Sequence, residues 1–139
     1  MDGLLARAED SMPNLAILVL DDEPIVGKRL RPALAKSGYV VDVVETGADA
    51  IRLIDEKIYD IVVTDIRMEG VDGIQVLRHA LARSPRTLVI MITGYATVEM
   101  AREALTIGAF DFLAKPFKLD DLREVIARAA AKLAAAGPS

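Results

Sequence analysis

The chain has 139 residues, 53% of them hydrophobic, which suits one domain with a sizeable core. It has no cysteine and one histidine, His79, which excludes disulfides and thiolate sites and argues against histidine-rich metal sites and Ser-His-Asp triads. A net charge of −4 argues against a broad nucleic-acid-binding surface. No apolar run approaches ~18 residues, so no membrane span is predicted. The N-terminus is a poor signal peptide, and we therefore expect a cytoplasmic globular protein.

Short, mostly β-branched apolar runs alternate along the chain with longer segments whose apolar residues recur at helical spacing. Most of the short runs are nearly continuous in apolar character, as in strands that are buried on both faces. The predicted strands are residues 16–20, 40–44, 60–64, 88–92 and 110–114. The predicted helices are residues 24–36, 47–57, 73–83, 97–107 and 119–134.

Local signals support these helices. Pro24 suits a first helical position and Thr46 an N-cap, while Gly38 and Gly108 suit helix C-termini. Pro32 conflicts with its helix, because it removes a hydrogen bond and predicts a kink.

Strands that alternate with helices predict a doubly wound α/β fold, with a parallel sheet covered by helices on both faces. Five strands fit the flavodoxin-like order 2-1-3-4-5, a (βα)5 arrangement. We expect the domain to span residues 14–134, with residues 1–13 as an N-terminal extension and 135–139 as a tail or the start of a linker.

Polar residues follow the strands at their carboxyl ends, where ligands bind in open α/β sheets. The first and third strands flank the switch point of this strand order, and neighbouring strands lie ~4.8 Å apart. Carboxylates from these two strands should therefore crowd one cleft. The residues at the strand ends are Asp21, Asp22 and Glu23 after the first, Asp65 after the third, Thr93 after the fourth and Lys115 after the fifth.

Crowded carboxylates are unfavourable unless a cation neutralises them, and Mg²⁺ suits a site of a few carboxylates, waters and a phosphate oxygen. Because three acids exceed what one Mg²⁺ needs, Asp65 is a candidate nucleophile that would form an aspartyl phosphate. Lys115 and the Thr93 hydroxyl are available to balance the phosphoryl oxygens. Each residue alone has a structural explanation: a turn or cap for Asp65, a turn for Thr93 and a solvated lysine for Lys115. Because all three residues stand at strand ends, their joint occurrence favours a phosphoryl-accepting site over these structural explanations.

The segments "ILVLDDEP", "DIVVTDIRMEGVDGIQVL", "VIMITGYA" and "GAFDFLAKPF" carry a family resemblance over about residues 15–130. In their order and spacing, the chain resembles a response-regulator receiver domain of two-component signal transduction. The later segments are similar to receivers of nitrogen- and dicarboxylate-regulating transcriptional activators.

The resemblance implies a role for each matching residue. Asp65 would be the phosphoacceptor. Asp22 would bind Mg²⁺ directly, Asp21 would act nearby, often through water, and the backbone carbonyl of Arg67 would be a further ligand. Thr93 would hydrogen-bond the phosphoryl group.

Three further expectations come from the same resemblance. Lys115 would pair with the phosphoryl group, and the Lys115–Pro116 bond would be cis. Phe112 stands at the position of the switch aromatic, although a core aromatic explains it equally well.

The implied function is a phosphorylation switch rather than an enzyme, limited to self-catalysed phosphoryl acceptance and autodephosphorylation. A sensor histidine kinase or a phosphotransfer protein would supply the phosphoryl group. The face made by helix 97–107, strand 110–114 and helix 119–134 would then change its affinity for an output domain or a second copy. No direct nucleic-acid or membrane binding by this domain is implied.

One departure from the family pattern is Glu69, where a proline is common, which leaves the rigidity of this loop open. We also hypothesise that Tyr95 and Arg67 shield the phosphoryl group from water.

Residues of this chain argue against three alternative functions. A haloacid-dehalogenase-type phosphatase would need a second aspartate where Arg67 stands. A nucleotide- or flavin-binding module would need a glycine-rich loop after the first strand, where acids stand instead. A degenerate receiver used only for binding is opposed by the intact residue set.

Overall fold

The computed structural model describes residues 14–66, 72–94 and 98–136, in which strands and helices alternate. The strands are β1 (Ala16–Leu20), β2 (Val40–Val44), β3 (Ile61–Asp65), β4 (Leu88–Thr93) and β5 (Asp111–Ala114). The helices are α2 (Pro24–Lys36), α3 (Gly47–Glu56), α4 (Gly73–Arg83), α5 (Val98–Ile107) and α6 (Leu119–Ala136).

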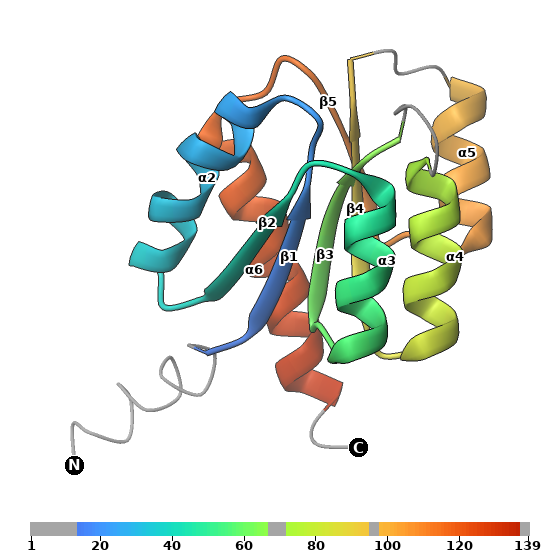
Figure 1. The fold of residues 1–139 in the computed structure, drawn as a ribbon, viewed down its shortest axis with the longest axis horizontal. Coiled ribbons are helices and arrows are strands. Elements are labelled where there is room, and N and C mark those ends of the chain that lie inside the picture. Colours follow the sequence, from blue (N-terminus) through green and yellow to red (C-terminus); the bar gives the residue numbers. More distant parts are fainter. Residues whose placement is uncertain (1–13, 67–71, 95–97, 137–139) are drawn as a thin grey trace.

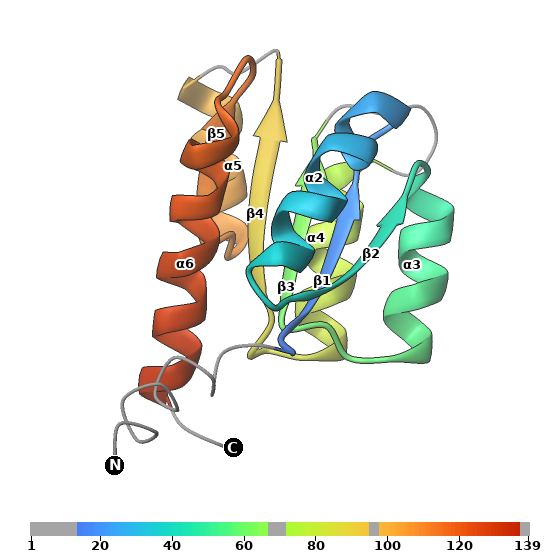
Figure 2. The same ribbon diagram turned by 90° about the vertical axis from the view of Figure 1, so that its left-hand side faces the viewer.

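The sheet has the order β2-β1-β3-β4-β5, and all its pairings are parallel, so the predicted fold is confirmed. Helices α2 and α6 cover one face, and α3, α4 and α5 cover the other (Figures 1 and 2). The chain changes direction across the sheet between β1 and β3, so the carboxyl ends of these two strands flank the switch point.

Two apolar layers hold the helices to the sheet. Alternate residues of the central strands point to opposite faces, as Leu18 and Val19 of β1 do, and both are fully buried. Leu18 packs in the layer under α3, α4 and α5, whereas Val19 packs in the layer under α2 and α6. Burial on both faces explains why the strands read as continuous apolar runs.

Most local signals act as predicted. The Thr46 side chain accepts a hydrogen bond from the Asp49 backbone N–H at 3.1 Å and caps α3. Gly38 and Gly108 have φ of 95° and 132°, and each follows the end of a helix. Helix α2 runs through Pro32 to Lys36, and Pro32 is exposed, so water can hydrate the backbone carbonyl that the proline leaves without a partner.

Element ends differ from the sequence prediction by one or two residues in several places. Strand β3 includes Asp65, because the backbone of Asp65 pairs with Ile92 of β4. Helix α6 continues to Ala136, two residues beyond the predicted end. Among the described residues, no helix is long and apolar enough to cross a bilayer.

Candidate phosphoacceptor and metal site

Three aspartates meet at the switch point. Asp21 directly follows β1 and Asp65 ends β3, and the register of these strands pairs Leu20 with Thr64, the residue before each. One carboxylate oxygen from each of Asp21, Asp22 and Asp65 lies within 4.8 Å of the other two. Asp21 and Asp65 are buried, whereas Asp22 is exposed. The crowding predicted from the strand order is therefore present.

Lys115 reaches this group from the end of β5. The Lys115 Nζ atom lies 2.8 Å from Asp21 Oδ2 and 3.0 Å from Asp65 Oδ2. Its backbone N–H donates to the Thr93 carbonyl oxygen at 2.8 Å, which fixes the start of the side chain next to β4. The long lysine stem thus brings one positive charge into a group of acids on other strands.

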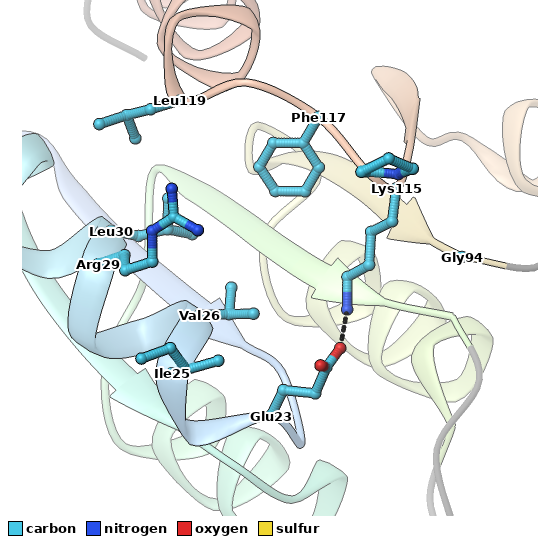
Figure 3. A pocket seen from close by; sticks show the side chains of 10 residues that line it. Glu23, Ile25, Val26, Arg29, Leu30, Gly94, Lys115, Phe117 and Leu119 are labelled. Atoms are coloured by element: carbon cyan, nitrogen blue, oxygen red, sulfur yellow. Dashed lines mark hydrogen bonds and ion pairs between the residues drawn. The ribbon is translucent and has the colours of Figure 1, made fainter.

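A third carboxylate contacts the same ammonium. Glu23 Oε1 accepts a hydrogen bond from Lys115 Nζ at 2.9 Å (Figure 3). Glu23 belongs to the acidic run after the first strand, but the sequence alone predicts no role for it in the site. The sequence signal that could have indicated a role is the acidic run itself, because Glu23 directly follows Asp21 and Asp22.

Burial and pairing set the ionisation of the site. Burial raises the pKa of Asp21 above its usual range, although the Lys115 ammonium and the Glu23 backbone N–H oppose this effect. Burial alone would lower the pKa of Lys115, but its contacts with Asp21, Glu23 and Asp65 raise it above its usual range. Lys115 is therefore charged at neutral pH and partly neutralises the acids.

The carboxylate group fits a hard cation. Asp21 Oδ2 is buried and lies 2.8 Å from the Lys115 ammonium, which Glu23 and Asp65 also contact. Several carboxylates that share one ammonium keep an excess of negative charge, which a metal ion with oxygen ligands would neutralise. The donor set consists of carboxylates, which Mg²⁺ and Ca²⁺ prefer.

The remaining predicted residues lie around this group or outside the described ranges. Thr93 is fully buried at the end of β4, directly after Ile92, the residue that pairs with Asp65. Phe112 of β5 is half-buried against the layer under α3, α4 and α5. The Lys115–Pro116 bond is cis, as expected.

Three residues with predicted roles fall outside the described ranges: Arg67, Glu69 and Tyr95. Their proposed parts in metal binding, loop rigidity and shielding therefore stay predictions.

Gly73 sets the distance between α4 and the acceptor strand. Its backbone N–H donates to the Ile66 carbonyl oxygen at 2.9 Å, so the first turn of α4 lies directly on the end of β3. A Cβ atom here would collide with the Asp65 carbonyl oxygen and lie 2.7 Å from Ile66 Cα.

Gly73→Ala is therefore expected to push α4 away from β3 and to lower the free energy of unfolding by about 2 kcal/mol. Urea denaturation would measure this loss. Gly94→Ala is the matched control, because within the described ranges a Cβ there would meet only Lys115 Cβ, at 3.8 Å. Equal stability of the two variants would contradict the close contact at Gly73.

Comparisons with known proteins identify the family of this chain. Residues 17–127 match the response regulator receiver domain family. Regulatory protein AtoC of Escherichia coli is 42% identical over 113 residues, which cover 81% of this chain and 24% of that protein. The C4-dicarboxylate transport transcriptional regulatory protein DctD of Rhizobium meliloti is 33% identical over 117 residues, 84% of this chain and 25% of that protein.

Solved structures show the same fold. A CheY-like response regulator receiver domain protein from Methanospirillum hungatei superposes with a TM-score of 0.85 at 27% identity, covering 89% of this chain and 99% of that one. NtrX from Brucella abortus gives a TM-score of 0.79 at 31% identity, covering 86% of this chain and 28% of that one. The chain spans about a quarter of the length of the curated relatives named above. The described chain belongs to the response regulator receiver domain family.

Proposed function

We propose that this receiver domain accepts a phosphoryl group on Asp65 in the presence of Mg²⁺. The observation that carries the proposal is the convergence of the Asp21, Asp22 and Asp65 carboxylates. The Lys115 ammonium contacts two of them, Asp21 and Asp65. If the cluster had only a structural role, one carboxylate would balance the charge of the lysine, and further acids would add only repulsion. A phosphoryl-accepting site needs them, since one acid reacts while the others hold a cation.

The metal would be held by Asp21, Asp22 and Asp65, with the Arg67 carbonyl as a further proposed ligand. When bound, Mg²⁺ would neutralise charge on the carboxylates and on the oxygens of the incoming phosphoryl group. Asp21 would gain most, because its side chain is fully buried and shares the Lys115 ammonium with Glu23 and Asp65.

The transfer itself would be a displacement at phosphorus. An Asp65 carboxylate oxygen attacks the phosphorus of a phosphohistidine donor, the new O–P bond forms, and the P–N bond breaks with its electron pair left on the imidazole nitrogen. Lys115 pairs with the transferred oxygens, and the Thr93 hydroxyl donates a hydrogen bond to them. In autodephosphorylation, water would attack the same phosphorus and the Asp65 O–P bond would break, which regenerates the carboxylate and releases inorganic phosphate. We propose no turnover of a separate substrate.

The signal would leave through the face formed by α5, β5 and α6. The phosphoryl group adds charge and acceptor oxygens beside Thr93 and Lys115. Thr93 is the last residue of β4, and Lys115 directly follows β5. Inward movement of these residues would favour one position of Phe112 on β5 and shift the population of that face. The unphosphorylated protein would sample the active form at a low level.

We propose that this domain has the partners expected of a response regulator receiver domain. The donor would be a sensor histidine kinase or a phosphotransfer protein, and the responding face would contact an output domain or a second copy of the chain. Support comes from the relatives: AtoC is a regulatory protein and DctD a transcriptional regulatory protein, and each is about four times as long as the matched region. We propose residues 14–134 as the receiver unit, a cytoplasmic location, and no direct contact of this unit with nucleic acid or membrane.

Labelling with acetyl phosphate tests the proposal. In Mg²⁺ the chain is expected to take up about one phosphoryl group per molecule, through a bond that hydroxylamine cleaves because it is an acyl phosphate. Removal of Mg²⁺ with a chelator is expected to reduce labelling to background. Labelling that survives chelation, or resists hydroxylamine, would contradict the metal-assisted acyl phosphate.

A further inference from the structure

Glu23 lies at the boundary between the acidic site and an adjoining cleft. The cleft, of about 500 Å³, is lined by Glu23, the first two turns of α2, Gly94, and residues from Lys115 to the start of α6 (Figure 3). The Glu23 side chain is 60% exposed, while those of Asp21 and Asp65 are 0% and 8% exposed. Of the three carboxylates that Lys115 contacts, Glu23 is therefore the one on the solvent side.

The backbone fixes where this carboxylate can go. The Glu23 backbone N–H donates to Asp21 Oδ1 at 2.8 Å, which ties its main chain to the buried aspartate. Glu23 is also the N-cap residue of α2, but its side chain makes no capping hydrogen bond. The Glu23 carboxylate instead contacts the Lys115 ammonium.

The two buried partners of Lys115 belong to the group that fits a metal, whereas Glu23 does not. A divalent cation would therefore repel the ammonium and compete with it for the Oδ2 atoms of Asp21 and Asp65, which Lys115 contacts. The lysine needs another partner when the metal binds.

We propose that Glu23 is a positioning residue that holds Lys115 at the solvent side of the site, so that the ammonium can release Asp21 and Asp65 to Mg²⁺ without leaving the site. The inference rests on the proposed Mg²⁺ site. It adds a residue that acts through Lys115 and touches neither metal nor phosphorus.

A double-mutant cycle with Mg²⁺ alone tests this role. Glu23→Gln removes the outer anchor, so Lys115 should pair more tightly with the buried acids and weaken Mg²⁺ binding. In a Lys115→Met background, only the direct effect of one lost exposed charge should remain. The weakening is expected to be about threefold to fivefold larger with Lys115 present, the size of one exposed ion pair.

The dissociation constants would come from amide NMR shifts of β1 and β3 during titration with MgCl₂, a readout that needs no phosphorylation. Equal weakening in both backgrounds would overturn the positioning role and leave the metal site intact. Absence of Mg²⁺ binding in the unmutated chain would instead sink the proposed function, so the two failures are distinct.

A second measurement covers the case in which Lys115→Met fails to fold. In a crystal structure of the unmutated chain with Mg²⁺, Lys115 Nζ is expected to keep its contact with Glu23 and to have left Asp21 Oδ2. An ammonium that stays on Asp21, or that abandons Glu23, would refute the proposal.

Discussion

Asp65→Asn is expected to abolish Mg²⁺-dependent labelling by acetyl phosphate. The amide keeps the shape of the side chain but lacks the anionic oxygen that would attack phosphorus. The change also removes one of three clustered negative charges, so the fold should be retained. Incorporated radiolabel per chain is the measurement, with far-ultraviolet circular dichroism as the check on folding.

Asp55→Asn is the matched control for this variant. It makes the same chemical change on α3, where the side chain is 60% exposed and contacts His79 at 2.7 Å. Labelling of the control should equal that of the unmutated chain. If Asp65→Asn is folded and is labelled as strongly as the control, then Asp65 is not the acceptor.

Lys115→Met is expected to lower the free energy of unfolding by about 3 kcal/mol at pH 7 without metal, because it leaves the buried Asp21 carboxylate without its cation. The Lys115 side chain is 17% exposed and that of Asp21 is 0% exposed, so solvent screens this pair weakly. Addition of Mg²⁺ should recover much of the loss, since a divalent cation can take the place of the ammonium. Urea denaturation in chelator and in Mg²⁺ would give both values.

Lys118→Met serves as the control, because Lys118 is exposed and its side chain removal should change stability little. The account would be wrong if Lys115→Met were as stable as this control in chelator. It would also be wrong if Mg²⁺ stabilised the unmutated chain and failed to stabilise the Lys115 variant. In either case the lysine and the metal would not share the same carboxylates.

The fold could be predicted from sequence because its signals are local and periodic. Runs such as residues 16–20 and 88–92 are apolar on both faces, which marks central strands, and Thr46 and Gly38 mark helix ends. The strand order then follows from the general rules for parallel sheets. The one-residue shift of β3 could not be predicted, because the pairing of Asp65 with Ile92 depends on a neighbour that lies distant in sequence.

The site could be predicted in part for the same reason. Strand order alone brings Asp21 and Asp65 together, because both stand at carboxyl ends next to the switch point. The contact between Lys115 and Glu23 could not be predicted, because it depends on the rotamers of two long side chains. It also requires that the Glu23 side chain, at the N-cap of α2, makes no capping hydrogen bond.

Chemical trapping of the labelled chain tests the central claim most directly. Borohydride reduces an acyl phosphate to the alcohol, so a phosphorylated aspartate becomes homoserine, and peptide mass spectrometry locates the altered residue. We predict homoserine at position 65 alone, formed in acetyl phosphate with Mg²⁺ and missing when Mg²⁺ is chelated. Homoserine at another acid, or phosphate recovered on a hydroxyl or imidazole with residue 65 unchanged, would contradict the account.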